Sequence, residues 1–281
     1  KGRKGRPNHN QMRIEIPDFE SKSELFAWLR KNHDSLIAKK KAFEVHGEIY
    51  KASGLGAVKS ISPAVVVDET MAEDTLQVKA VINTTLVMDS HSDVHDNGLW
   101  KKSLKENDAF YHLQEHKQSF SHVLSDNSKA YVQSMRWTDL GVEAEGETEA
   151  LVFESRLNKA DNPQMFDAYK KGKVRNHSVG MRYVKMLFAM NSDDPQDSQY
   201  KENFDNYIGK IANRDAAEKQ GYFWVVKEAK LIEGSAVVFG SNSVTPTLQI
   251  TTRKAEPVEA TPKDEPDLTN IIKDIKNIKF K

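Results

Sequence analysis

The feature that most constrains the fold of this chain is an alternation of apolar and polar residues that recurs between residues 75 and 239. Residues 75–83 show it clearly, because Leu76 and Val78 alternate with polar side chains, as in a strand with one buried face. Residues 139–141 (DLG) are typical of a hairpin turn. Further strands are predicted at 130–137, 142–145, 151–156, 178–187, 222–232 and 235–239. The sequence therefore predicts a mostly β domain.

Three segments have helical periodicity instead, at 21–41, 162–171 and 212–220. Ser21 and Glu24 have the spacing of a capping box, in which each side chain bonds a backbone N–H of the other residue. Pro163 stands in the first turn and Gly172 just past the end of the second segment, as in many helices. The third segment closes a polar insertion, 191–220, that we expect to project from the sheet. The predicted fold class is α+β, mostly β with flanking helices.

The composition divides the chain into three regions. Residues 1–42 contain a basic arm and the first amphipathic helix, and residues 43–252 contain the β domain. Residues 253–281 form a charged linker punctuated by proline, followed by a short amphipathic helix. Such a linker has too few apolar residues to bury a core. We therefore expect partners to attach, and processing to occur, at the two ends.

Several kinds of site are excluded by composition. The chain has no cysteine, which excludes disulfides, thiolate metal sites and a cysteine nucleophile. Its 41 basic and 41 acidic residues balance, so we expect no specific nucleic-acid partner. No apolar run approaches the ~18 residues of a membrane-spanning helix, and no signal peptide is expected, because the segment after the basic start is polar. Hydrolytic chemistry would require a hydroxyl, a carboxylate, a histidine or a metal.

Histidines gather in one part of the chain, since five of the nine lie between residues 91 and 122. Residues 112–116 (HLQEH) match the H-x-x-E-H pattern of inverted zincins, in which two histidines one helical turn apart bind zinc and the glutamate acts as base. That chemistry requires a helix, whereas residues 109–113 fit a strand equally well. A zinc metallopeptidase using His112, Glu115 and His116 is therefore kept as an alternative.

A second metal candidate lies at residues 91–96. His91, Asp93 and His95 would share one face of a strand. The following residues 96–98 (DNG) are a strong turn signal, so a polar loop is the preferred interpretation. We therefore predict no metal and no cofactor.

A third candidate is the serine at position 178, in the segment 176–180 (NHSVG). Gly180 leaves space for backbone N–H groups to approach a substrate oxygen, as an oxyanion hole requires. A serine within a strand is by itself a weak indication of catalysis, and the surrounding segments strengthen it.

Five segments, in this order along the chain, resemble the sequence boxes of the prohead (capsid maturation) proteases of tailed phages, which are related to the herpesvirus assemblins. They are 89–100 (DSHSDVHDNGLW), 112–117 (HLQEHK), 137–142 (WTDLGV), 169–181 (YKKGKVRNHSVGM) and 229–242 (AKLIEGSAVVFGSN). The resemblance covers residues 80–248. Five ordered segments are much more specific than any one of them.

The resemblance implies an assemblin-like β-barrel, closed or partly closed, surrounded by helices. It also implies a catalytic triad in which Ser178 is the nucleophile, His116 the general base and Glu233 the orienting acid. In such a triad the imidazole accepts the serine proton and the carboxylate fixes the imidazole tautomer. The main-chain amides of Val179 and Gly180 are the candidate oxyanion donors.

The sequence departs from the family pattern at several positions. His122 and Gly234 stand where the family often has glycine and a β-branched residue, and residues 240–242 (GSN) replace Pro-Ala-Asn. His112 and His177 compete for the role of base, although His177 should point away from Ser178 because adjacent strand residues face opposite sides. Glu154 competes for the role of acid.

The function implied is a serine endopeptidase acting inside the assembling prohead in the host cytoplasm. Its substrates would be the scaffold and major capsid proteins and the protease itself, and a homo-oligomer is compatible with this role. A non-catalytic assembly or scaffold protein with a protease-like barrel is a further alternative, and it predicts that Ser178, His116 and Glu233 do not converge.

Overall fold

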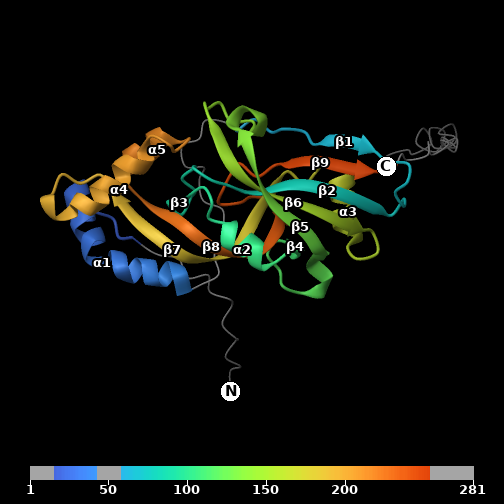
Figure 1. Ribbon diagram of the computed structural model, residues 1–281, viewed down its shortest axis with the longest axis horizontal. Helices are drawn as coiled ribbons and strands as arrows, with labels where there is room; N and C mark the ends of the chain where they lie inside the picture. The colour runs from blue at the N-terminus through green and yellow to red at the C-terminus, as the bar shows by residue number, and fades with distance from the viewer. Residues whose placement is uncertain (1–15, 43–57, 254–281) are drawn as a thin grey trace, which may run out of the picture.

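The computed structural model describes residues 16–42 and 58–253 and has a mixed α+β fold (Figure 1). The strands are β1 (Ala64–Val67), β2 (Thr75–Thr84), β3 (Asp93–His95), β4 (Phe110–Gln114), β5 (Val123–Arg136), β6 (Glu147–Asn158), β7 (Asn176–Met190), β8 (Tyr222–Val237) and β9 (Thr247–Thr252). The helices are α1 (Lys22–Ala42), α2 (Lys101–Glu106), α3 (Pro163–Lys170), α4 (Ser198–Ile208) and α5 (Arg214–Gln220). Short 3₁₀ helices lie at Phe120–His122, Trp137–Leu140 and Pro195–Asp197. The predicted α+β class is confirmed.

All nine strands of the described residues belong to one mixed sheet. Its hydrogen-bonded order is β1-β9-β2-β6-β5-β4-β8-β3, with β7 paired to β8 in addition. This path is not closed among the described strands, so the closed barrel implied by the resemblance is not formed by them. β8 pairs in parallel with β3 and β4 and antiparallel with β7, so it lies next to three other strands.

The two strands predicted at 222–232 and 235–239 are in fact one long strand, β8. Gly234 lies between the two predicted segments and continues the strand, because packing requires a glycine at this position. A Cβ at Gly234 would lie 2.8 Å from Phe153 Cε2, because the phenyl ring packs directly on the backbone. The predicted strand at 142–145 is wrong, since these residues belong to the connection between β5 and β6. The hairpin turn at 139–141 is confirmed, with Gly141 at a φ of 79°.

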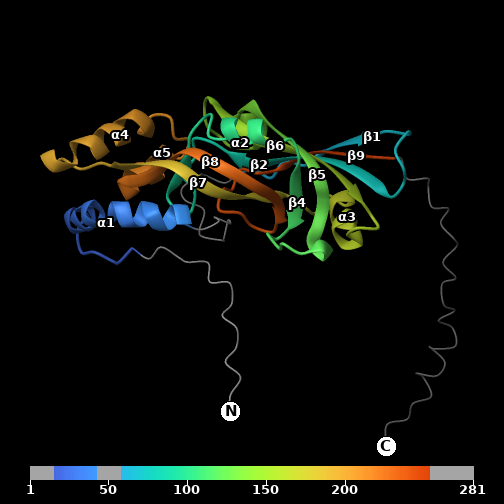
Figure 2. The ribbon, with the colours of Figure 1, turned by 60° about the horizontal axis from the view of Figure 1, so that its bottom comes forward.

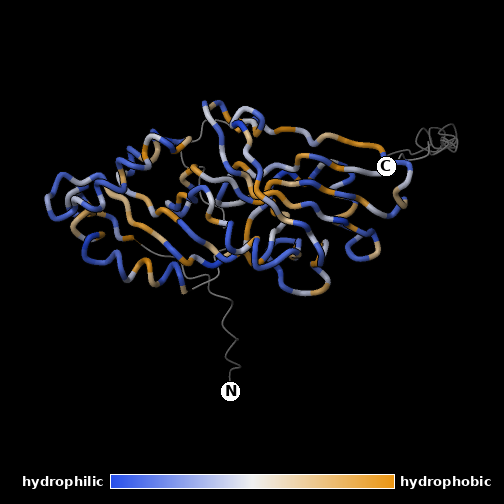
Figure 3. The backbone as a smooth tube through the Cα atoms, in the orientation of Figure 1, coloured by the Kyte–Doolittle hydropathy of each residue, from blue (hydrophilic) through white to orange (hydrophobic). Residues whose placement is uncertain are grey.

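Three strands (β1, β3 and β9) were not predicted, and β4 is the strand alternative given for residues 109–113. β1 is an uninterrupted apolar run at the edge of the sheet, and its valines are exposed (Figure 3). β3, β4 and β9 are only three to six residues long. An alternating pattern is recognisable over about four to eight residues with one buried face, whereas β3 is shorter than this and the buried residues of β9 do not alternate.

Helices cover both faces of the part of β7 and β8 that extends beyond the rest of the sheet (Figure 2). α1 packs on the face that carries Phe188 and Trp224, and these residues share a core with Leu29 of the helix. α4 and α5 pack on the other face, against Phe223. α4 lies inside the predicted polar insertion and was missed, because only a few of its residues are apolar.

The three predicted helices are confirmed, and the third, predicted at 212–220, is α5 (Arg214–Gln220). α1 spans Lys22–Ala42, and the Ser21 hydroxyl accepts a hydrogen bond from the Glu24 backbone N–H (3.2 Å). α3 begins at Pro163, and the Asn162 side chain caps it by accepting from Met165 N–H (3.1 Å). The basic arm and the C-terminal amphipathic helix lie outside the described residues. Within residues 16–42 and 58–253, no helix is both long and apolar enough to cross a membrane.

Candidate active site

The predicted base and acid, His116 and Glu233, meet at the end of β4. The His116 Nδ1 atom lies 2.6 Å from Glu233 Oε1, and the side chains are only 10% and 2% exposed. Since a carboxylate only accepts, Nδ1 carries the shared proton and Nε2 is the basic nitrogen of the neutral ring. This is the tautomer that a general base in a serine protease requires.

The backbone just after β4 directs His116 toward β8. Glu115 still pairs with β8, because its N–H donates to Ala236 O (3.0 Å). Glu115 and His116 then adopt φ values of 53° and 56°, in the left-handed region that non-glycine residues rarely occupy. Each such residue costs roughly 1–2 kcal/mol. Strain of this kind is concentrated at functional sites, where the surrounding contacts hold it in place.

Two small residues surround the Glu233 carboxylate. The Ser235 hydroxyl donates to Glu233 Oε2 (2.6 Å) and accepts from the His116 backbone N–H (3.1 Å). On the opposite strand, a Cβ at Gly180 would lie 2.2 Å from Glu233 Oε1. Only a glycine at position 180 leaves room for the carboxylate in this position.

Ser178 lies beside this pair on β7. The antiparallel register places Ser178 opposite Ser235 and Gly180 opposite Glu233. Directly opposed residues project to the same face with Cβ atoms about 5 Å apart, so Ser178 shares the face of Ser235 and Glu233. Its side chain is nearly buried, at 5% exposure. No hydrogen bond joins Ser178 to His116 within the part of the chain that the structure describes.

The two predicted oxyanion donors are consecutive residues of one strand. Val179 and Gly180 lie inside β7, opposite Gly234 and Glu233. In an antiparallel strand, successive N–H groups point to opposite edges, so only one of the two amides faces away from β8. One of the two amides therefore faces β8, and the assignment of Val179 and Gly180 as oxyanion donors stays a prediction.

The helix required by the H-x-x-E-H interpretation is absent, because residues 110–114 form β4. His112 points into the core and is fully buried, with Nδ1 2.9 Å from Ser155 Oγ and Nε2 3.2 Å from Tyr169 OH. Glu115 is exposed and pairs with Lys117. His112 and His116 therefore do not present their ring nitrogens to one metal ion. The competing acid, Glu154, lies on β6, and its Oε1 atom accepts a hydrogen bond from Tyr131 OH (2.7 Å) rather than from His116.

Behind the candidate site, on the core face, lies a continuous chain of buried polar groups. The Tyr169 hydroxyl is 2.9 Å from His177 Nε2, and His177 Nδ1 is 3.0 Å from Thr245 O. A carbonyl only accepts, so His177 carries its proton on Nδ1 and accepts at Nε2 from Tyr169. The Tyr169 oxygen then accepts from His112, which accepts from Ser155, which accepts from Ser128 (2.8 Å). In this arrangement of protons both imidazole rings are neutral.

This chain predicts a loss of stability in acid. Burial lowers the pKa of His177 to about 4 and also lowers the pKa of His112 well below its usual value. The unfolded chain binds these protons near pH 6.5, whereas the folded chain does not. The free energy of unfolding should therefore fall as the pH drops from about 6.5 to 4, by roughly 3 kcal/mol for His177 alone.

Urea unfolding at pH 7 and pH 4.5 measures this effect. In the variant His177→Gln, we expect a lower stability at pH 7 and a smaller loss on acidification than in the parent protein. The control His122→Gln removes a histidine from the surface and should keep the full loss. An unchanged pH dependence in His177→Gln would contradict the assignment of the proton chain.

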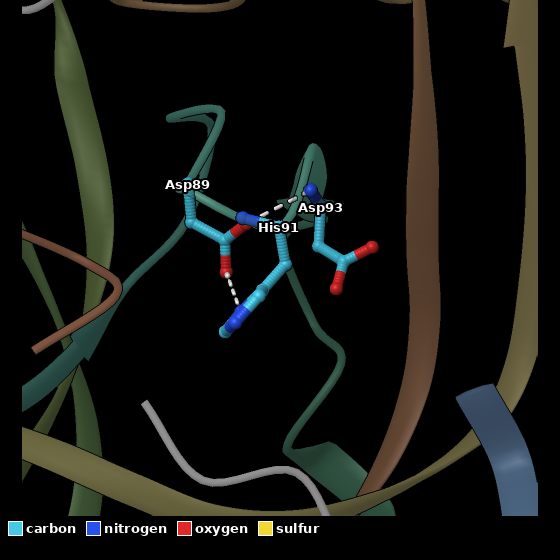
Figure 4. Close-up of side chains that lie close together, drawn as sticks. All are labelled: Asp89, His91 and Asp93. Carbon is cyan, nitrogen blue, oxygen red and sulfur yellow. Dashed lines mark hydrogen bonds and ion pairs between the residues drawn. The ribbon is translucent and has the colours of Figure 1, made fainter. Parts of the chain in front are cut away.

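Asp89, His91 and Asp93 form a second cluster in the connection between β2 and β3 (Figure 4). Their ligand atoms lie within 4.8 Å of one another, which would suit a cation. The cluster includes Asp89 rather than the predicted His95, whose Nδ1 instead lies 2.8 Å from Asn83 Nδ2. The preferred interpretation of a polar loop fits residues 89–92, whereas residues 93–95 form β3.

An ammonium group already neutralises this second cluster. Lys40 Nζ of α1 donates to Asp93 Oδ1 (2.6 Å) and to His91 O (3.2 Å), and Tyr183 OH donates to Asp93 Oδ2 (2.8 Å). Asp89 Oδ1 accepts from the His91 and Asp93 backbone N–H groups, and burial raises the pKa of Asp89. The contacts describe a buried ion pair that fastens α1 to β3.

A groove of about 670 Å³ adjoins the candidate triad. Its walls come from β4, β7, β8 and the residues that follow β4, and they include Glu233, Tyr111, Arg182 and Lys230. Phe120 lies at the groove and is 93% exposed. The groove therefore reaches Glu233, the acid of the His116–Glu233 pair.

A comparison of this chain with protein-family models, curated proteins and solved structures found no match.

Proposed function

We propose that this protein is a serine endopeptidase in which Ser178 is the nucleophile, His116 the general base and Glu233 the orienting acid. The observation that carries the proposal is the 2.6 Å hydrogen bond between His116 Nδ1 and Glu233 Oε1, with Ser178 on the same face of the sheet. These three residues are 55 or more positions apart in sequence, and the acid among them, Glu233, also lines the groove.

The reaction follows from these positions. His116 Nε2 accepts the hydroxyl proton as Ser178 Oγ bonds to the carbonyl carbon of a peptide. Glu233 stabilises the imidazolium, which then gives its proton to the leaving amine as the C–N bond breaks. Water, deprotonated by His116, hydrolyses the acyl ester and restores the Ser178 hydroxyl. Each of these roles uses a contact or a shared face described above.

The biological role that we propose comes from the resemblance of five ordered segments to prohead proteases. The protein would act in the host cytoplasm, inside the assembling prohead, and would cut scaffold and capsid proteins and its own chain. A β-barrel of the assemblin kind, closed or partly closed, belongs to the same proposal. Since His112 and His116 face different environments, the metallopeptidase alternative receives no support from the site.

Covalent labelling tests the proposed nucleophile without a known substrate. The purified protein is incubated with a fluorophosphonate probe, which phosphonylates only an activated serine, and the adduct is located by peptide mass spectrometry. We expect one adduct on Ser178, none in His116→Ala, and no protection by a zinc chelator. An unlabelled protein, or labelling that persists in His116→Ala, would contradict the triad.

A further inference from the structure

A fourth side chain, that of Ser235, touches both the acid and the base of the proposed triad. It is fully buried on β8, two residues after Glu233 and directly opposite Ser178. Its single hydroxyl proton is donated to Glu233 Oε2 (2.6 Å), and its oxygen accepts from the His116 backbone N–H (3.1 Å). One oxygen atom therefore joins the side chain of the acid to the main chain of the base.

We infer that Ser235 is a positioning residue that sets the geometry between His116 and Glu233. This inference rests on the proposed function of the site.

The two hydrogen bonds restrict different degrees of freedom. The Glu233 carboxylate can rotate about the Cγ–Cδ bond. The Ser235 hydroxyl donates to Oε2 and thereby fixes this rotation, so that Oε1 points at His116 Nδ1. The second bond holds the backbone of His116, which has a φ of 56° and would otherwise relax toward a common conformation. Without the hydroxyl, the carboxylate and the imidazole would both lose their alignment.

Ser235 is not a second nucleophile. Its hydroxyl proton is directed to a carboxylate oxygen rather than to an imidazole nitrogen, and its side chain is fully buried. A nucleophilic serine requires a base at its own proton and access to the substrate carbonyl. Ser178 lies directly opposite Ser235 on the neighbouring strand β7 and is 5% exposed.

The rate of phosphonylation by a fluorophosphonate probe measures this role. The rate at saturating probe reports activation of Ser178, and the half-saturating concentration reports probe binding. We expect Ser235→Ala to lower the saturating rate about 10- to 100-fold, as for a lost hydrogen bond to a charged group, and to leave the half-saturating concentration unchanged. Ser235→Cys keeps a weaker donor and should give an intermediate rate.

Ser128→Ala is the matched control, because Ser128 is an equally buried serine of the same sheet, and among the described residues its hydroxyl bonds Ser155. It should lower the melting temperature without changing the phosphonylation rate. Rates are compared at a temperature at which near-ultraviolet circular dichroism shows each variant to be folded. If Ser235→Ala does not fold, the phosphonylation rate of Ser235→Cys tests the positioning role in its place.

The outcomes separate this inference from the proposed function. If the parent protein is labelled on Ser178 and both Ser235 variants react at the parent rate, the positioning role is wrong and the triad stands. If the parent protein is not labelled on Ser178, the proposed function itself fails. Equal slowing in Ser235→Ala and Ser128→Ala would indicate a general effect of packing and would overturn the positioning role.

Discussion

The variant Ser178→Ala is expected to stop proteolysis, with a fall in the rate of at least about 10⁴-fold. The reason is that the attacking oxygen is removed while the groove, His116 and Glu233 remain in place. The fold should be unaffected, because Ser178 loses one oxygen that makes no hydrogen bond to the described residues. Cleavage is followed by intact mass spectrometry of the protein alone and of scaffold and capsid proteins coexpressed with it.

Ser125→Ala is the control for this prediction. Ser125 is also a nearly buried serine of the sheet, on β5 and opposite His112. The variant Ser125→Ala should cleave its substrates at the same rate as the parent protein. Cleavage retained by Ser178→Ala would exclude the proposed nucleophile, and a chelator would then show whether a metal carries the activity.

The alternation of residues was sufficient to predict which side chains share a face. It placed Ser178 and Gly180 on one side of β7 and His177 on the other, and His177 does lie in the core, bonded to Tyr169 and Thr245. This prediction is reliable because successive side chains of a strand alternate regardless of its partners. Which strand lies beside which, by contrast, depends on contacts between distant residues.

The roles of Ser235 and Gly180 could not be predicted from the sequence for this reason. Their positions around Glu233 depend on the register of β7 against β8, which no local pattern specifies. The local sequence also does not distinguish two structures for residues 112–116, since it is compatible both with a helical metal motif and with a strand. These residues form the strand β4 because they pair with β5 and β8 in the folded chain.

The helices were predicted where they have caps and apolar stripes, as in α1 and α3. α4 was missed because the insertion is polar, and only residues such as Phe204 and Tyr207 bury its inner face. Two large aromatic side chains suffice for a short helix that packs on an existing sheet, since tertiary packing supplies most of the stability of a short helix.

The second large effect is expected from Gly180→Ala, which adds one methyl group to β7. The new Cβ would lie 2.2 Å from Glu233 Oε1 and 2.9 Å from Glu233 Cδ, distances that no pair of non-bonded atoms sustains. The carboxylate must move, and it then leaves His116 Nδ1. Loss of the orienting acid costs a serine protease about 10⁴-fold in rate, so we expect a loss of roughly 10³- to 10⁴-fold.

Gly209→Ala is the matched control, because a Cβ at Gly209 would meet no atom within 4 Å and the residue has ordinary helical dihedral angles. It should retain full activity and stability. Gly180→Ala should also lower the free energy of unfolding by about 1–3 kcal/mol, as overpacking does in other cores. Full activity in Gly180→Ala would show that the position of the Glu233 carboxylate does not matter for cleavage.

A double-mutant cycle then identifies the clash as the cause. Glu233→Ala removes the carboxylate that the new methyl group would strike, so the destabilisation caused by Gly180→Ala should largely disappear in this background. Residues in direct contact give coupling energies of about 0.5–3 kcal/mol, which urea unfolding resolves. The double variant should still show no cleavage, because it has room for the new methyl group but lacks the Glu233 carboxylate that orients His116. Recovered stability without recovered cleavage would separate the role of Glu233 in packing from its role in orienting His116, and additive destabilisation would show that the methyl group acts elsewhere.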